Sequence, residues 1–128
     1  MQLQLSVLPN RLAVCRLDAG TPPPDWSLAG NFFSVSVTPE ETSVVCEEAW
    51  VPGGVQTDAG WCAFKVAGPL DFSLTGILLA IAAPLAEAGV GIFAVSTHDT
   101  DYVLVKQDSL DTAISALRSV GHTVVLPA

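Results

Sequence analysis

GPLDFSLTGILLAIAAPLAEAGVGIFAVSTHDTDYVLV, residues 68–105, is the stretch that decides the fold. After its opening Gly-Pro-Leu-Asp turn, apolar residues recur at the three-to-four-residue spacing of an amphipathic helix; they are Leu74, Ile77, Leu78, Ile81 and Leu85. Asp71 or Ser73 can cap this helix. Pro84 lies inside the helix and predicts a kink, and Gly89 predicts its end.

The segments around this helix complete a recognisable order. Residues 61–66 precede it as a strand, and residues 92–95 and 102–105 follow as two strands joined by a polar turn. A second helix, capped by Asp108 or Ser109, then leads into a strand over 123–126. The order β-α-β-β-α-β predicts an α+β, ferredoxin-like sandwich, in which four antiparallel strands carry both helices on one face.

The first half of the chain predicts strands and turns. Residues 3–7 and 12–17 suggest a hairpin, and residues 32–37 and 42–46 suggest a second strand pair. The proline-rich stretch between the two pairs, residues 18–25, predicts a loop with at most one helical turn through Asp25-Trp26-Ser27. A Gly- and Pro-rich segment, residues 50–60, marks the best boundary in the chain. We therefore expect two units, residues 1–58 and 59–128.

Composition limits the function classes. The net charge of −8, from 13 acidic and 5 basic residues, repels phosphate backbones and anionic membranes, so neither nucleic acid nor a membrane is an expected partner. The start of the chain has no export-signal pattern, and three cysteines without a Cys-x-x-Cys spacing suggest core thiols in a reducing, cytoplasmic compartment. With 50% apolar residues, the small chain predicts that some apolar surface is covered in a homodimer.

The turn over residues 96–101 carries the most polar chemistry. His98, Asp99 and Asp101 could be considered as metal ligands, but a single histidine nearby favours a polar hairpin turn. Ser96, His98 and Asp101 lie too close in one turn to converge as a catalytic triad. We therefore expect no catalytic activity, no metal and no cofactor. Asp101 either closes the turn through backbone N–H groups or accepts from a ligand amine.

The three tryptophans and Asp71 can each have a structural role or contact a ligand. Trp26, Trp50 and Trp61 are expected to cover the junction between the two halves, with an aromatic lid over a ligand as the alternative. Asp71 is expected to cap the helix, although a cap at a pocket rim could also contact a ligand.

The second half resembles the ACT domain, a small ferredoxin-like module that binds amino acids and regulates metabolic enzymes. Three segments carry the match: residues 68–72, residues 83–89 and residues 92–102. Phe32-Phe33-Ser34-Val35, Thr38-Pro39-Glu40-Glu41 and the Ser96-Thr97-x-x-x-Asp101 turn look more closely like bacterial proteins grouped with aspartokinase regulatory domains and animal cytosolic arginine sensors. The resemblance implies a tandem of two ACT-like units, the first degenerate and strand-rich.

The resemblance also implies a ligand site formed by the loop before the first helix and by the strand and turn after it. The residues implied on the helix side are Leu70, Asp71, Thr75, Gly76 and Ile77, and those on the turn side are Thr97, His98 and Asp101. Backbone N–H groups at a helix start suit a ligand carboxylate, and an aspartate suits an ammonium or guanidinium. Arginine sensors have glycine and acidic residues at the helix start, whereas this chain has Asp71-Phe72-Ser73-Leu74, so the expected amino acid is not specified as arginine.

Together these features predict a non-catalytic amino-acid-binding sensor or regulatory subunit, dimeric and acting on a protein partner of unknown identity. The alternative is a structural or oligomerisation module whose pocket is vestigial.

Overall fold

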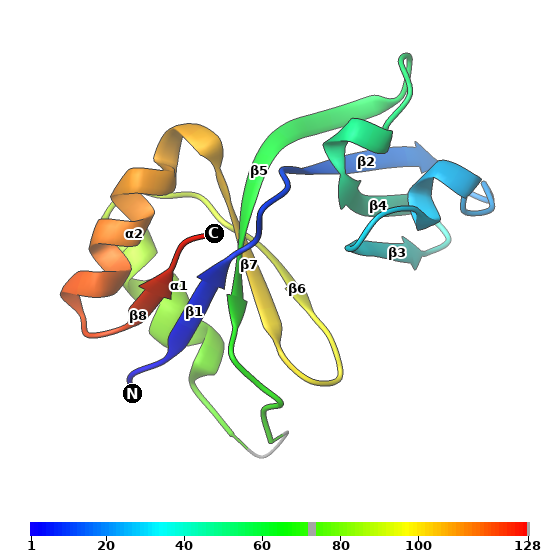
Figure 1. The fold of residues 1–128 in the computed structure, drawn as a ribbon. Helices are drawn as coiled ribbons and strands as arrows, with labels where there is room; N and C mark the ends of the chain where they lie inside the picture. The colour runs from blue at the N-terminus through cyan, green and yellow to red at the C-terminus, as the bar shows by residue number, and fades with distance from the viewer. Residues whose placement is uncertain (72–73, 128) are drawn as a thin grey trace. The chain divides into compact units, whose positions relative to one another are not determined.

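The computed structural model describes residues 1–71 and 74–127. Contacts within the chain define two compact units, Asn10–Trp61 and Met1–Pro9 with Cys62–Ala128. We call the first the strand-rich unit and the second the helical unit. Strand β5 (Gln56–Val66) starts in the strand-rich unit and ends in the helical unit, so one continuous strand serves both, as its course in Figure 1 shows.

The first strand of the chain belongs to the helical unit, although the sequence predicted it in the first unit. Strand β1 (Gln4–Val7) pairs antiparallel with β5 and parallel with β8 (Thr123–Val125), so the expected hairpin with the next strand is wrong. The physical reason is burial, because Leu5 and Val7 enter the core of the helical unit. The two units therefore divide the chain differently from the expected boundary between residues 58 and 59.

The helical unit has the predicted element order. After β5 come α1 (Ile77–Glu87), β6 (Phe93–Ser96), β7 (Asp101–Lys106), the short 3-10 helix η3 (Gln107–Ser109), α2 (Leu110–Ser119) and β8. Its strands lie in the order β6-β7-β5-β1-β8. The predicted α+β, ACT-like fold class is confirmed.

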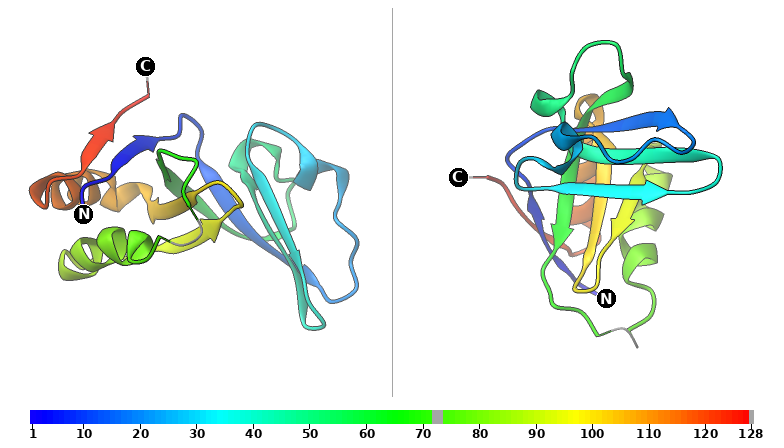
Figure 2. Two further views of the ribbon diagram at one scale, coloured as in Figure 1. Left: turned by 90° about the horizontal axis from the view of Figure 1, so that it is seen from below. Right: turned by 90° about the vertical axis from the view of Figure 1, so that its right-hand side faces the viewer.

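The core of the helical unit lies on one face of this sheet. Alternate strand residues such as Phe64, Val66, Val103 and Val105 meet the apolar faces of both helices there. The contact residues of the helices include Ile77, Ile81 and Leu85 from α1 and Ala113, Ile114 and Leu117 from α2. Figure 2 shows the two helices side by side on this face.

Helix α1 continues through Pro84, which lies inside it. Proline has no N–H to donate to the carbonyl four residues earlier, which belongs to Ala80. The buried ring of His122 supplies the missing donor, because its Nε2 lies 2.8 Å from the Ala80 oxygen. His122 Nδ1 accepts a hydrogen bond from the N–H of Leu3 at 3.0 Å, which assigns the ring proton to Nε2. One histidine thus connects α1 to the start of the chain.

The strand-rich unit contains β2 (Leu12–Asp18), the 3-10 helix η1 (Asp25–Leu28), β3 (Phe33–Val37), β4 (Glu41–Glu47), the 3-10 helix η2 (Glu48–Trp50) and the first part of β5. Strands β3 and β4 form the predicted antiparallel pair, and β2 pairs with β4 and β5. The core contains Ala13, Cys15, Val44 and Cys46, and Trp26 packs against it. Trp26 is therefore a partly buried residue at the edge of this unit's core.

Polar side chains hold the long segment between β2 and β3. The hydroxyl of the fully buried Thr42 donates to the Thr21 oxygen at 2.7 Å. Glu47, which is 8% exposed, accepts hydrogen bonds from the N–H groups of Asn31 and Phe32 at 2.6 and 3.2 Å. Gly30 leaves room for this carboxylate, because a Cβ at residue 30 would lie 2.7 Å from it. These contacts order a segment that contains only one short 3-10 helix.

No described helix is long and apolar enough to cross a membrane. The three cysteines, Cys15, Cys46 and Cys62, are buried and form no disulfide within the described residues, as expected for core thiols.

Candidate functional site

Two segments of the helical unit are joined next to the start of α1. The first is the loop after β5, and the second is the turn between β6 and β7. The N–H of Leu70 in the loop donates to the Asp99 oxygen in the turn at 2.7 Å, and the buried Thr100 hydroxyl donates to the Val66 oxygen at 2.7 Å. Gly68 permits this approach, since a Cβ on it would lie 3.0 Å from the Asp99 oxygen. The sequence-predicted loop and turn are therefore neighbours.

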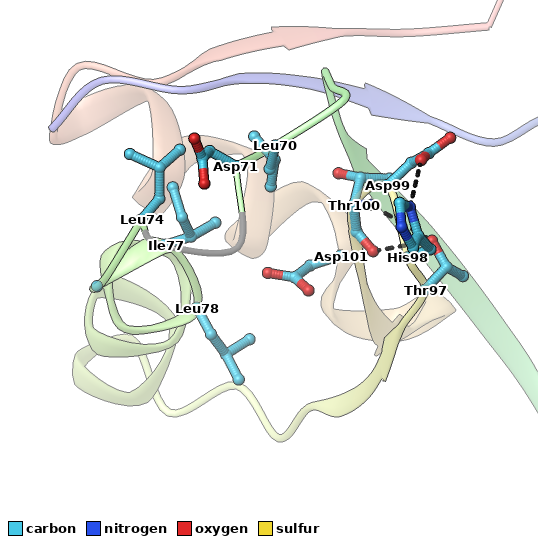
Figure 3. Close-up of a pocket in the computed structure, with 11 residues that line it drawn as sticks. Leu70, Asp71, Leu74, Ile77, Leu78, Thr97, His98, Asp99, Thr100 and Asp101 are labelled. Carbon is cyan, nitrogen blue, oxygen red and sulfur yellow. Dashed lines mark hydrogen bonds and ion pairs between the residues drawn. The ribbon is translucent and has the colours of Figure 1, made fainter.

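A cavity of about 280 Å³ lies between the loop, the turn and the first residues of α1 (Figure 3). Seven of the eight predicted site residues line it: Leu70, Asp71, Gly76, Ile77, Thr97, His98 and Asp101. The eighth, Thr75, is exposed on the loop and is not part of the lining. Ligand binding by these residues stays a prediction.

Four further residues line the cavity that the sequence did not assign to it: Leu74, Leu78, Asp99 and Thr100. Leu74 and Leu78 match the helical periodicity that predicted α1, yet they are 49% and 39% exposed. Leu74 also precedes the helix, which begins at Ile77. Helical periodicity cannot distinguish a core residue from one at a cavity rim. The sequence feature that could have assigned these four residues to the cavity is that they lie in the same short segments as the predicted site residues.

The start of α1 differs from the expected one. Gly76 is the N-cap residue, with a φ of 79°, and no side chain of the described residues caps the helix by a hydrogen bond. Capping by Asp71 is therefore wrong, and Ser73 lies outside the described residues. The loop instead turns through a hydrogen bond from the Leu74 N–H to the Asp71 oxygen at 3.0 Å. Positive φ favours glycine, which explains why residue 76 can make the sharp entry into the helix.

Asp101 does not close the turn between β6 and β7. Thr97 does so, because its N–H and hydroxyl donate to the Thr100 oxygen at 2.8 and 3.1 Å and its Oγ1 accepts from the Thr100 N–H at 3.3 Å. Over residues 1–71 and 74–127, the Asp101 carboxylate forms no hydrogen bond or ion pair with another residue. Figure 3 shows it pointing from β7 toward α1. The alternative in which it stabilises the turn is wrong.

His98 and Asp99 interact with each other at the tip of the turn. His98 Nδ1 lies 3.0 Å from Asp99 Oδ1, and both side chains are largely exposed. Among the described residues, no group of three or more histidine, cysteine or carboxylate side chains is arranged to hold a metal ion. The pair is a surface feature of the cavity rim.

The electrostatics of the cavity follow from its lining. Asp71, Asp99 and Asp101 contribute carboxylates, and no lysine or arginine is among the described lining residues. Across the cavity from Asp101, α1 begins at Ile77, where the first N–H groups of a helix carry a partial positive charge. The arrangement suits a small molecule that carries both a cationic and an anionic group.

A model of the ACT domain matches residues 56–119, which include β5, both helices and the cavity. The chain belongs to the ACT domain family. A separate N-terminal-domain model matches residues 10–54, which cover most of the strand-rich unit. The resemblance noted from the sequence is thereby confirmed.

Relatives support this assignment over most of the chain. The bovine cytosolic arginine sensor for mTORC1 subunit 1 is 33% identical over 98 residues, which cover 68% of this ACT protein and 30% of the sensor. Across the first curated relatives the chain spans 30% to 63% of their lengths.

Solved structures agree in fold. An Agrobacterium tumefaciens protein is 37% identical with a TM-score of 0.94, covering 100% of this chain and 96% of that one. The regulatory subunit of aspartate kinase from Thermus thermophilus has a TM-score of 0.62 at 10% identity, covering 90% of this chain and 97% of that one. At that identity the second match supports the fold alone.

Proposed function

We propose that this ACT protein is a non-catalytic sensor that binds one free amino acid in the 280 Å³ cavity of its helical unit. The observation that carries the proposal is the Asp101 carboxylate, which points into the cavity and has no partner among the described residues. A carboxylate in this state is a suitable acceptor for a ligand ammonium group.

The ligand carboxylate is placed on the opposite side. The first N–H groups of α1 follow Gly76, which lines the cavity and carries no side chain that would cover them. Leu70, Ile77 and Leu78 offer apolar contact for a side chain between the two charged ends. The amino acid thereby contacts both the loop and the turn.

Regulation follows from this double contact. A ligand that binds one arrangement of the loop and turn more tightly than another shifts the protein toward the first arrangement. We propose that a cytoplasmic homodimer presents this shift to a protein partner. Leu79 on α1 is 68% exposed, and with Leu74 and Leu78 it provides apolar surface near the cavity that assembly would cover.

Thermal unfolding with each of the common amino acids tests the proposal. A ligand at 100 times its Kd should stabilise the protein by about 2.7 kcal/mol. Asp101→Asn should remove most of this gain without loss of the unliganded fold, because it replaces a charge that has no partner among the described residues. Asp111→Asn, on the exposed side of α2, is the matched control and should keep the full gain.

Two outcomes would count against the proposal. If no amino acid raises the unfolding temperature at millimolar concentration, the structural or oligomerisation module becomes the better explanation. If Asp101→Asn binds as tightly as Asp111→Asn, a different part of the protein holds the ligand.

A further inference from the structure

A second cavity, of about 210 Å³, lies on the other side of the same turn. It shares Thr97, Asp99 and Thr100 with the first cavity, so the turn separates the two. Its remaining lining includes Lys65 and Tyr102. The sequence did not assign either residue to a site.

Strand alternation places Lys65 and Tyr102 on the same face of the sheet. Phe64 and Val66 in β5, like Val103 in β7, point into the core under the helices. Their neighbours Lys65 and Tyr102 therefore point to the opposite face, and β5 and β7 are paired strands. An ammonium and a phenol are thus presented side by side at the end of the sheet that carries the turn.

The second cavity differs in charge from the first, because its described lining contains one lysine and one aspartate where the first contains three aspartates. Lys65 is the one lysine or arginine among the described residues that line either cavity. Its ammonium forms no ion pair or hydrogen bond within residues 1–71 and 74–127.

The acidic residue of this cavity is already engaged. Asp99 Oδ1 lies 3.0 Å from His98 Nδ1, and the Asp99 backbone oxygen accepts the Leu70 N–H. Figure 3 shows the Asp99 carboxylate pointing away from Asp101 and toward His98. This contact orients the Asp99 carboxylate without removing its charge, and Lys65 carries the one ammonium or guanidinium group among the described residues that line the cavity.

We propose that the second cavity is a binding subsite for a small oxyanion, a carboxylate or a phosphate, with Lys65 as its charge partner. The Tyr102 hydroxyl lines the same space and has the donor chemistry that an oxyanion accepts. The subsite does not depend on which amino acid the first cavity takes. Because both cavities share the turn, an anion here would also act on the Asp101 side of that turn.

Titration of the whole protein with succinate and with inorganic phosphate tests this subsite. Binding is followed by isothermal calorimetry and by amide NMR shifts of Thr97 and Thr100, against sodium chloride at matched ionic strength. We expect saturable binding of at least one anion, and the arm that responds identifies carboxylate or phosphate as the favoured chemistry.

Variants of the two lysines of the chain provide the matched pair. Lys65→Met should weaken anion binding about tenfold or more, as expected when a charge-assisted hydrogen bond is lost. Lys106→Met, which removes a lysine that lines neither cavity, should change it less than about twofold. Lys65→Arg keeps the charge and should retain binding, which separates loss of charge from loss of fold.

The subsite is refuted if neither anion gives shifts beyond those of chloride, or if Lys65→Met and Lys106→Met weaken binding equally. Neither result bears on amino-acid binding at Asp101, which the thermal unfolding assay measures independently.

Discussion

The strand-rich and helical units contain the same hairpin turn. In the turn between β3 and β4, the Thr38 N–H and hydroxyl donate to the Glu41 oxygen at 2.9 and 3.3 Å, and Thr38 Oγ1 accepts from the Glu41 N–H at 3.2 Å. Thr97 and Thr100 repeat these three bonds between β6 and β7. The strand registers also agree, since Val37 pairs with Thr42 and Ser96 with Asp101.

The residue after the turn is where the units differ. In the strand-rich unit it is Thr42, which is fully buried and bonded to the oxygen of Thr21 in the unit's own proline-rich loop. In the helical unit it is Asp101, which lines a cavity next to α1. The comparison teaches that one turn can serve either as a structural anchor or as a candidate ligand site. The turn is an anchor where a loop of the same unit packs against it, as Thr21 does, and a candidate ligand site where a cavity lies beside it.

The largest expected effect concerns the buried histidine of the helical unit. His122→Leu leaves the Ala80 oxygen and the Leu3 N–H without their partner, which should lower the free energy of unfolding by about 3 kcal/mol. Urea denaturation measures the loss. Adding Pro84→Ala should recover part of it, because alanine restores an N–H for the Ala80 oxygen. Equal losses with and without Pro84→Ala would contradict the assigned role of His122.

The free energy of unfolding should fall at alkaline pH because of a buried cysteine in the strand-rich unit. Burial, followed by the neighbouring Cys15, raises the pKa of Cys46 from 9.0 to about 11. Between these values the unfolded chain binds fewer protons than the folded chain, so the free energy of unfolding falls as pH rises. The slope is roughly 1.4 kcal/mol per pH unit.

Chemical denaturation between pH 8 and 11, against Cys46→Val, measures this slope. Valine is the residue that the helical unit has at the matching position, Val105, and it has no proton to lose. A wild-type slope that is no steeper than that of Cys46→Val would contradict the prediction.

Glu47 should stabilise the strand-rich unit by accepting backbone hydrogen bonds. Lys106, at the matching position of the helical unit, has an ammonium group that cannot accept them. Glu47→Leu removes the acceptor of the Asn31 and Phe32 N–H groups and should cost about 2 kcal/mol. Glu47→Gln keeps one side-chain oxygen and should cost less. Urea denaturation compares the two variants, and the prediction fails if glutamine is as harmful as leucine.

The smallest expected effect is also the most direct comparison of the units. Thr42→Val and Thr100→Val each remove one buried hydroxyl that donates to a backbone oxygen at 2.7 Å, that of Thr21 for Thr42 and that of Val66 for Thr100, so each should cost about 1 kcal/mol. Only Thr100→Val should also weaken amino-acid binding, because Thr100 lines the cavity and holds its loop. Calorimetric titration distinguishes them, and similar affinities for both variants would break the comparison.

Local patterns were sufficient for most elements of the fold. Apolar residues at helical spacing predicted α1, and alternation predicted β3, β4, β6 and β7. The partner of β1 was not predictable, because alternation shows that a strand has one buried face without showing which strands flank it. The start of α1 was missed for a related reason, since Leu74 continues the periodicity although the helix begins after Gly76.

By itself, the sequence determined the element order of the helical unit, its family and the two segments that carry the polar groups of the candidate site. These properties follow from spacing along the chain and from residue chemistry. The tertiary structure alone decided that Asp101 faces a cavity while Thr42 is an anchor, that His122 completes the helix interrupted by Pro84, and that Lys65 lies beside Tyr102. Each of these depends on which atoms of distant segments become neighbours, and hydrogen bonds and charge interactions act over a few ångströms of space regardless of separation along the chain.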